Sequence, residues 1–406
     1  MTAESLVLRG ASLVDGTGAP ARPATVVVDG ERITSLEGEA RPGATEVDLA
    51  GHTLLPGLID AHTHLAMTEM GRQTDGWVPA AVLAAQIFGN ASRMIDAGFT
   101  TARDVGGADG GLAQAIDLGL IRGPRLLPSG PVLCQTGGHG DFGPPFHPHM
   151  HGIPGLADGT IVCDGPEEVR RAARTALRRG ATQLKVCVSG GVLSHSDSLE
   201  DSQFTVEELR AAVEEAAARR TYVTAHAHTV GGIRNGLSAG IACFEHGTFL
   251  DEETVSAMAS AGVALVPTLA VLRVAVERWR EMDIPEEMLP RFDGVEDAMN
   301  ASIKLAHAAG VPIGSGSDLF GPAQDRWGLE LALKARLLGP MEAIVSATGT
   351  NARIIRRPDI GTVETGKLAD LVAVRGNPLD DPELFDDAAN ITLVIKGGRV
   401  MKSLLG

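Results

Sequence analysis

Aromatic side chains and basic charge are both scarce in this chain of 406 residues. Phe, Trp and Tyr make up 3% of it, with a single tyrosine, so the core must be mostly aliphatic. That scarcity disfavours a stack of aromatic rings for nucleic-acid bases. The 35 Lys and Arg residues are outnumbered by 51 Asp and Glu residues, which gives a formal net charge of −16 at pH 7. A surplus of negative charge argues against nucleic acid or an anionic membrane as the main partner.

Long apolar runs and closely spaced cysteines are also missing. No stretch reaches the roughly 18 continuous apolar residues that a membrane-spanning helix needs. The first residues, MTAESLVLRG, carry an acidic side chain early and do not have the pattern of a signal peptide. The cysteines show no metal-site spacing and stand far apart at Cys134, Cys163, Cys187 and Cys243. We therefore expect a cytoplasmic protein with reduced thiols and no membrane partner.

Between residues 57 and 356, short apolar runs alternate with helical patterns. The pattern EELRAAVEEAAARR at 207–220 is that of an amphipathic helix. The expected strands are 58–64, 99–105, 125–129, 183–188, 222–227, 242–246, 263–267 and 311–317. The expected helices include 78–97, 108–119, 166–179, 205–219, 252–261 and 296–309. Eight such repeats predict an α/β protein of the (β/α)8 TIM barrel type. A doubly wound open sheet is the rival, but no Gly-rich phosphate motif follows the first strand.

The two ends of the chain share a different texture. Residues 1–56 and 357–406 read as short strands broken by glycine, and neither piece has enough strands for a core of its own. We expect them to combine into one small composite β-sandwich domain, with residues 57–356 forming the catalytic barrel.

Polar side chains occur at the ends of the predicted barrel strands. His62 and His64 are two apart in LIDAHTHL, so on a strand both point to the same side. Lys185 interrupts the apolar run QLKVCV, where a buried amine tends to lose its proton. A neutral amine can add CO2 and become an anionic carbamate that bridges two cations.

The later strands add further candidate ligands. His226 and His228 share a face in YVTAHAHT, His246 ends CFEHGT, and Asp318 closes VPIGSGSDLF. Each residue alone has an ordinary structural explanation. Five such groups at the ends of strands one, four, five, six and eight instead indicate a metal site, for which imidazole and carboxylate are typical ligands.

These motifs resemble those of the amidohydrolase superfamily over nearly the whole chain. They are PGLIDAHTHL at 56–65, LKVCVSGG at 184–191, HAHT at 226–229, FEHG at 244–247 and SGSD at 315–318. The tail IGTVETGKLADLVAV at 360–374 is similar to the closing strands of its composite β domain. Further motifs resemble the metal-dependent prolidase-like branch, which includes Xaa-Pro dipeptidases and ochratoxinase-like amidases. They are TGGHGD at 136–141, SGGVLS at 189–194, QFTVEEL at 203–209 and FGPAQDRWGLELAL at 320–333.

The resemblance implies a cofactor of two divalent metal ions, most typically Zn. It assigns His62, His64 and Asp318 to the more buried ion, and His226 and His246 to the second. Carbamylated Lys185 would bridge the two. A metal-bridging hydroxide would attack the amide carbon, and Asp318 would carry the proton to the leaving nitrogen.

Other residues are expected to contact substrate. His139 in TGGHGD is the best candidate to stabilise the oxyanion. Related sequences look to have tyrosine where this chain has His228. Ser189 and His195 lie on or next to the SGGVLS motif. Arg103, at the end of the second strand, would pair with a substrate carboxylate or with the neighbouring Asp104.

The predicted function is hydrolysis of an amide or peptide bond in a small substrate, such as a dipeptide, an N-acyl amino acid or an ochratoxin-like amide. One alternative is a relative that acts on another amide, a carbamate, a urea or a cyclic amide, as imidazolonepropionase does. Another is a catalytically silent scaffold, against which the complete ligand set argues. Two long segments, 134–164 and 270–295, are expected to decide specificity. The chain could also pair as a homo-oligomer.

Overall fold

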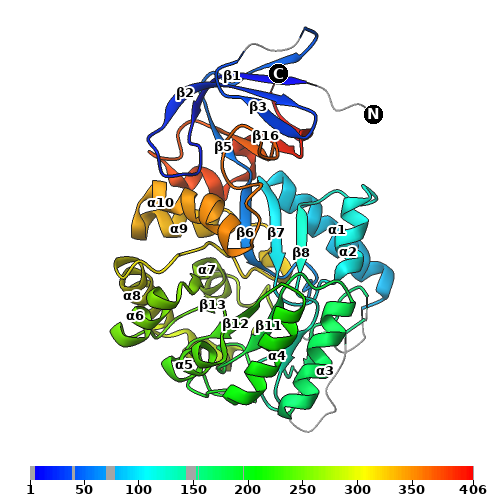
Figure 1. Ribbon diagram of the computed structural model, residues 1–406, viewed down its shortest axis with the longest axis vertical. Helices are drawn as coiled ribbons and strands as arrows, with labels where there is room; N and C mark the ends of the chain where they lie inside the picture. The colour runs from blue at the N-terminus through cyan, green and yellow to red at the C-terminus, as the bar shows by residue number, and fades with distance from the viewer. Residues whose placement is uncertain are drawn as a thin grey trace.

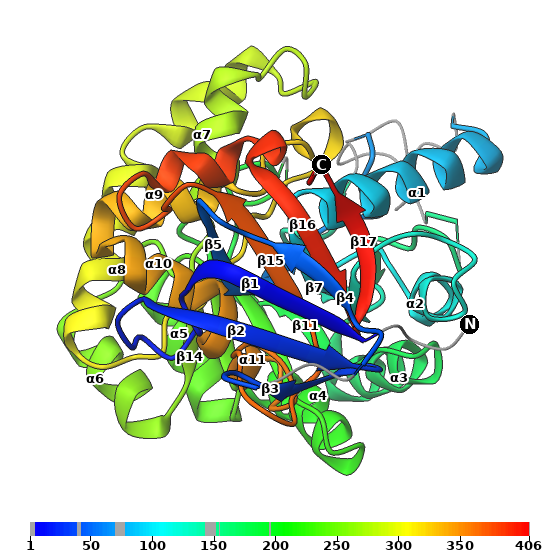
Figure 2. The same cartoon turned by 90° about the horizontal axis from the view of Figure 1, so that it is seen from above.

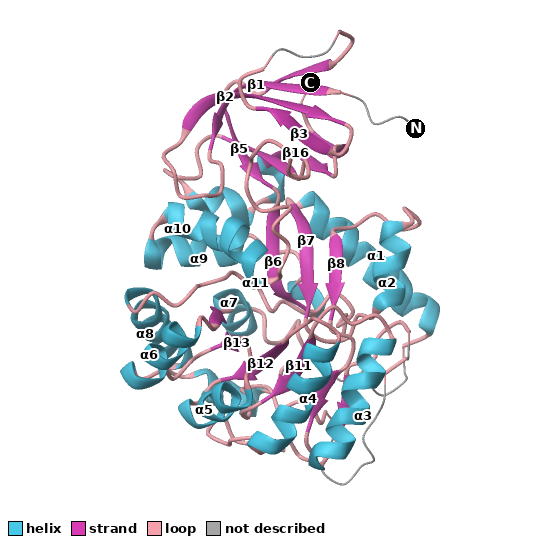
Figure 3. Cartoon of the chain, in the orientation of Figure 1, coloured by secondary structure: helices cyan, strands magenta, loops and turns pink. Residues whose placement is uncertain are grey.

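The computed structural model describes residues 5–38, 42–69, 78–142, 152–153, 155–194 and 196–405. Its larger part holds parallel strands with helices outside them, as Figure 3 shows by secondary structure. The strands are β6 (Leu58–Thr63), β7 (Phe99–Asp104), β8 (Arg125–Pro128), β9 (Val132–Cys134), β10 (Thr160–Val162), β11 (Leu184–Cys187), β12 (Val223–Ala227), β13 (Cys243–His246) and β14 (Ala264–Val266). They match seven of the eight predicted barrel strands, and β9 and β10 are additions.

Backbone hydrogen bonds connect these strands in the predicted order. The sheets run β6–β7–β8 and β10–β9–β11–β12–β13–β14. Thr182 N donates to Pro128 O over 2.8 Å, which joins β8 to the start of β11. The predicted eighth strand at 311–317 forms a single parallel bridge, from Ile313 to β14. Ala61 N donates to Ser315 O over 2.9 Å, so this segment also lies against β6.

The helices begin and end where local chemistry favours it. They are α1 (Ala80–Asp96), α2 (Gly110–Asp117), α3 (Gly165–Arg178), α4 (Val206–Ala218), α5 (Val230–Ala239), α6 (Glu252–Ala261), α7 (Leu269–Glu277), α8 (Val295–Ala308), α9 (Leu329–Leu338), α10 (Pro340–Val345) and α11 (Asn351–Ile354). Thr205 and Glu208 form a capping box at the start of α4. The sequence analysis missed α5, whose glycines disfavour a helix; Thr229 caps it by accepting a hydrogen bond from Gly232 N.

A second sheet combines the two ends of the chain. Strands β1 (Leu6–Leu13), β2 (Arg22–Asp29), β3 (Arg32–Ser35), β4 (Thr45–Asp48) and β5 (His52–Pro56) join β15 (Leu371–Arg375), β16 (Ile391–Lys396) and β17 (Arg399–Ser403). Strand β5 pairs antiparallel with β15, so the contact between the two ends of the chain is a direct ladder. Figure 1 shows this sheet at one end of the molecule, and Figure 2 shows the blue and red strands side by side.

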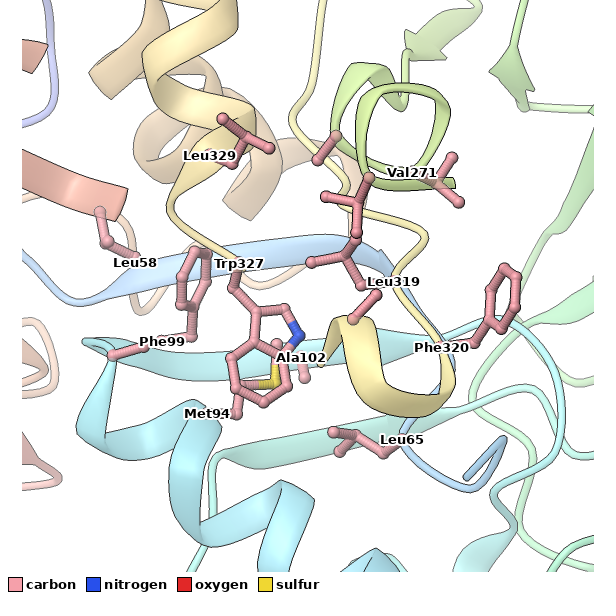
Figure 4. Packing of buried hydrophobic residues seen from close by; sticks show 14 of the residues in the cluster. Leu58, Leu65, Met94, Phe99, Ala102, Val271, Leu319, Phe320, Trp327 and Leu329 are labelled. Carbon is pink, nitrogen blue, oxygen red and sulfur yellow. The ribbon is translucent and has the colours of Figure 1, made fainter. Parts of the chain in front are cut away.

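The largest hydrophobic cluster lies between β6, β7 and the helices beside them. Trp327 is 1% exposed and packs among Met94, Phe99 and Leu319, as Figure 4 shows. The indole therefore fixes the segment that follows Asp318 against the barrel wall. In the part of the chain that the structure describes, no helix combines the length and apolar character that crossing a membrane would require.

Candidate metal centre

A cavity of about 510 Å³ lies at the carboxyl ends of the barrel strands. Twelve of its lining residues have side chains with metal-binding or acid–base groups. Eight of them are residues that the sequence analysis singled out: His62, His64, His139, Lys185, His226, His228, His246 and Asp318. The other four are Glu69, Asp141, Cys187 and Asp283. The structure thus brings together all the predicted metal ligands, although they come from strands far apart in sequence.

Asp318 lies at the centre of the first group. Its Oδ1 is 3.3 Å from His62 Nε2 and 3.1 Å from His64 Nε2, and its Oδ2 is 3.8 Å from His246 Nδ1. The ligand atoms of His62, His246 and Asp318 all lie within 4.8 Å of one another. Burial opposes ionisation of Asp318, but His62, His64 and His246 hold its pKa well below the usual range. The carboxyl group is therefore an anion at neutral pH.

The second group consists of three histidines. Ring nitrogens of His226, His228 and His246 lie within 4.8 Å of one another, so His246 belongs to both groups. The rings of His228 and His246 are stacked, with centroids 5.0 Å apart. His228, which the sequence analysis expected to contact substrate, thus lies among the candidate ligands.

Each of these histidines has a second partner that holds its ring. His62 Nδ1 lies 2.8 Å from Glu245 Oε2, and His64 Nδ1 lies 3.0 Å from Gly106 O. His226 Nε2 lies 3.1 Å from Gly190 O, a carbonyl that can only accept a hydrogen bond. Such contacts fix the tautomer and direct the other nitrogen toward a ligand, as around metal-bound histidines.

The charge state of the donors suits a divalent cation. Burial lowers the pKa of His226 and of His246 well below the ordinary value, and neighbouring imidazoles lower that of His226 further. Both rings are therefore neutral and have a lone pair to offer. Neutral imidazoles with one carboxylate form a donor set typical of Zn²⁺. The residues fit the metals that the sequence predicts.

Lys185 lies in the same cavity with only 3% of its surface exposed. Within the described part of the chain, its Nζ forms no hydrogen bond. Burial lowers the pKa of this amine, although the charges of Glu245 and Asp318 oppose the shift. A desolvated amine with no hydrogen-bond partner is a nucleophile.

His139 lies on the cavity wall against His226, with ring centroids 4.0 Å apart. Burial lowers its pKa to about 4, so the ring is neutral. Its Nδ1 is 3.2 Å from Ser194 Oγ, which itself donates to the Asp197 carboxylate. With its own proton directed to Asp197, Ser194 Oγ accepts a hydrogen bond from Nδ1. In this arrangement the single proton of the neutral ring lies on Nδ1 and not on Nε2.

Three of the expected substrate contacts are placed differently or are not described. Arg103 is 0% exposed and does not line the cavity. It pairs with Glu245 rather than with Asp104, because its Nη2 lies 2.7 Å from Glu245 Oε1. Ser189 is also fully buried; it donates to Gly190 O and accepts from His228 N, so it positions the backbone. His195 lies outside the described residues, as do His147, His149 and His151.

The sequence analysis gave no role to Glu245. This carboxylate lies between Arg103 and His62 and also accepts from Thr224 Oγ1. Burial alone would raise its pKa, but Arg103 and His62 lower it to about 2. The available signal was a charged residue inside the buried strand CFEH, which requires a buried partner.

Two of the candidate ligands have unusual backbone conformations. His246 has φ 66° and Asp318 has φ 56°, which residues other than glycine rarely adopt. Asp318 N donates to His62 O over 2.8 Å, and His246 Nδ1 lies 2.8 Å from Thr268 Oγ1. These contacts hold the strained residues where their side chains meet, as is typical of functional sites.

The rest of the cavity wall is largely apolar, apart from the carboxylates of Glu69, Asp141 and Asp283, and much of it comes from the two long segments. Val271 and Leu272 of α7 line it, together with Met288 and Phe292 of the 3₁₀ helix Glu286–Phe292. From the other segment, residues including Phe142 line it. Among the described residues no arginine faces this cavity.

Comparisons with known proteins define the class. The model of the amidohydrolase family matches residues 53–401. The ochratoxinase of Aspergillus niger is 32% identical over 409 residues, covering 96% of this chain and 85% of that protein. A prolidase crystallised with N-methylphosphonate-L-proline superposes with a TM-score of 0.93 and 35% identity, covering 98% of this chain and 100% of the other. A Xaa-Pro dipeptidase with bound methionine superposes with a TM-score of 0.86 and 31% identity, covering 98% of this chain and 99% of the other.

The site and fold are thus those of a hydrolase that acts on C–N bonds. The chain belongs to the amidohydrolase family. Its resemblance to ochratoxinase and prolidase structures, predicted from the motifs, is confirmed, and so is the α/β class with a barrel and a small β domain. Members of this family generally use divalent metals, and the histidine and aspartate groups provide a place for them.

Proposed function

We propose that this protein hydrolyses the amide bond of small dipeptides or N-acyl amino acids with the help of two divalent metal ions, most typically Zn²⁺. The observation that carries the proposal is the pair of overlapping ligand groups, joined at His246, at the base of a largely apolar cavity. The similarity to a prolidase, a Xaa-Pro dipeptidase and an ochratoxinase supports the same class of substrate.

We assign His62, His64 and Asp318 to one ion and His226 and His246 to the other. His228 is close enough to the second group to complete it or to contact substrate beside it. When bound, the ions would lower the pKa of water to supply a nucleophile and would polarise the substrate carbonyl.

Lys185 is assigned to the bridge between the two ions. Its neutral amine would add to CO2, forming an N–C bond and releasing one proton, to give a carbamate whose single negative charge is shared by two oxygens. Its burial and lowered pKa support this chemistry, because only the unprotonated amine can react. The carbamate would also put an anion beside the metals in place of an amine that can take up a proton.

Asp318 is assigned the proton transfer. Its ionised carboxylate accepts a proton from the attacking water and returns it to the amide nitrogen, which cannot leave as an anion. His139 is assigned to the substrate carbonyl, a role that requires a proton on Nε2. Because the ring is neutral, this role needs the tautomer with its single proton on Nε2, in which Ser194 Oγ donates to Nδ1 instead of to Asp197.

The apolar wall favours substrates with apolar side chains. Phe142, Val271, Leu272, Met288 and Phe292 offer no charge to a ligand. The metal-loaded protein should therefore release free amino acid from apolar Xaa-Pro and Xaa-Xaa dipeptides or from N-acyl amino acids, measured by chromatography. Asp318→Asn should abolish the release, and Asp325→Asn, at an exposed aspartate, is the matched control. No hydrolysis across such a panel would refute the proposal.

A further inference from the structure

A second cavity, of about 400 Å³, lies at the opposite end of the barrel strands from the histidines. Its walls come from the end of α3, from the loops that lead into β11 and β12, and from the residues after α11. These loops stand at the amino ends of the strands, whereas the candidate metal ligands stand at the carboxyl ends. None of the catalytic groups described above lines this cavity.

Four arginines line this second cavity: Arg219, Arg220, Arg356 and Arg357. Arg357 pairs with Asp359, with Nη2 2.7 Å from Oδ2. Within the described ranges, the other three have no carboxylate within ion-pair distance. The guanidinium of Arg356 lies over the ring of Tyr222, 4.7 Å from its centroid. Its Nη1 also donates to Thr221 O over 3.3 Å. In a protein with a net charge of −16, three arginines without a carboxylate partner that line one cavity are an unusual concentration of positive charge.

The backbone at two of these arginines gives an independent observation. Arg220 and Arg356 have φ of 59° and 58°. Each follows a helix and closes its last turn: Arg220 N donates to Ala217 O, and Arg356 N donates to Arg353 O. This is the position after a helix where glycine is the usual residue, because a side chain is strained there.

Other helices of this chain do place glycine at that position. Helices α1, α2, α3, α5, α6 and α8 are followed by left-handed glycines, which are Gly98, Gly119, Gly180, Gly240, Gly262 and Gly310. Among the helices that the structure describes, only α4 and α11 are followed by a left-handed arginine, and both of these arginines line the second cavity. The strained backbone therefore coincides with two of the arginines that line the cavity.

We propose that this cavity binds a phosphorylated small molecule. Planar guanidinium groups form paired hydrogen bonds with phosphate oxygens, which suits Arg220 and Arg356, two lining residues that come from distant segments of the chain. Leu127, Leu177 and Ile355 provide apolar wall for the organic part of the ligand. The proposal does not depend on the reaction assigned to the metal centre.

The test is calorimetric titration of the metal-loaded protein with glucose 6-phosphate and with inorganic phosphate. We expect saturable binding, with glucose 6-phosphate the tighter ligand. Arg220→Gln/Arg356→Gln should raise its Kd by about tenfold or more, as expected for losing charge-assisted hydrogen bonds. Arg210→Gln/Arg399→Gln removes the same charge from exposed arginines elsewhere and should leave Kd unchanged.

Two further variants separate the alternatives. Arg220→Gly/Arg356→Gly should weaken binding equally but keep or raise Tm, because glycine relieves the left-handed backbone. Asp318→Asn should bind the sugar phosphate as the unaltered protein does. The proposal is overturned if no saturable binding is seen, or if the Arg210→Gln/Arg399→Gln control loses as much affinity as the cavity variant. It is also overturned if only Asp318→Asn loses affinity, because that result would place the anion at the metal centre. A Tm below that of the unaltered protein, or equal affinity for both ligands, would also contradict it.

Discussion

Residues other than glycine with a strained, left-handed backbone occur at both ends of the barrel, but the side chains that they carry are different. At the carboxyl ends of the strands, His246 and Asp318 have positive φ and are held by hydrogen bonds. At the amino ends, Arg220 and Arg356 have positive φ, and their guanidinium groups form no ion pair with a described residue. At the carboxyl ends the strained side chains meet one another, whereas at the amino ends the strained arginines have no carboxylate partner among the described residues. The difference is consistent with the proposed reaction centre at one end and the proposed phosphate site at the other.

A chain of contacts through the barrel interior connects the two ends. Tyr222, in the wall of the arginine-lined cavity, accepts a hydrogen bond of 3.4 Å from Arg103 Nη1. Arg103 pairs with Glu245, which lies 2.8 Å from His62 Nδ1. Variants along this chain therefore test how separate the two ends are.

The largest effect is expected for Asp318→Asn. An amide cannot accept the proton of the attacking water, so kcat should fall by about 10²–10⁴-fold, the contribution typical of general acid–base groups. Steady-state kinetics on the best dipeptide of the panel provide the measurement, with metal content determined in parallel. Activity retained at full metal content would remove the proton-transfer role from Asp318.

Lys185→Ala should come next. Without the bridging group, metal content should drop below about two ions per chain and activity should be lost with it. A short carboxylate such as acetate or propionate should restore part of both, because it can occupy the space of the missing carbamate. Metal analysis and kinetics, with Lys304→Ala as control, check this. Full activity without an added carboxylate would contradict the carbamate.

Glu245→Gln should have an intermediate effect. It removes the anion that holds His62, so metal affinity should fall by about 10–100-fold. It also leaves Arg103 buried without a counter-charge, which should cost about 3–5 kcal/mol of unfolding free energy. Arg103→Met/Glu245→Gln should regain most of the stability but not the metal affinity. Denaturant unfolding and metal titration of the single and the double variant separate the effect of Glu245 on stability from its effect on metal affinity. Recovery of both stability and metal affinity in the double variant would make Glu245 purely structural.

The smallest effect is expected for Tyr222→Phe. The hydrogen bond from Arg103 Nη1 is long at 3.4 Å, so its loss should cost at most about 1 kcal/mol of stability. We expect kcat/KM to change by less than about twofold. A larger change in kcat/KM at unchanged metal content would show that the two ends are coupled.

Much of the fold could be predicted because it follows from local periodicity. Buried parallel strands such as β12 are short apolar runs, and α4 carries its cap and amphipathic pattern in consecutive residues. The exceptions have local reasons. The glycines of α5 disfavour a helix in the sequence, but its cap and its packing stabilise one. The segment 311–317 forms only a single bridge and little regular ladder.

The candidate ligands could also be predicted, since they lie on or just after the predicted strands and parallel strands end at the same edge. How these ligands group in space could not be predicted from the sequence. Whether His228 lies beside His226 and His246, or whether Arg103 reaches substrate or Glu245, depends on side-chain directions set by the whole barrel. The pair Arg103–Glu245 joins residues 142 positions apart, and no local pattern encodes it.

The sequence by itself determined the family, the barrel with its terminal β strands, and the residue types that meet at the carboxyl edge. Tertiary structure decided which carboxylate holds His62, which loop side chains form an apolar wall, and that arginines from the ends of α4 and α11 share one cavity. The reason is physical. Periodicity and capping act between neighbours along the chain, whereas burial, charge pairing and cavity shape arise only when distant segments pack together.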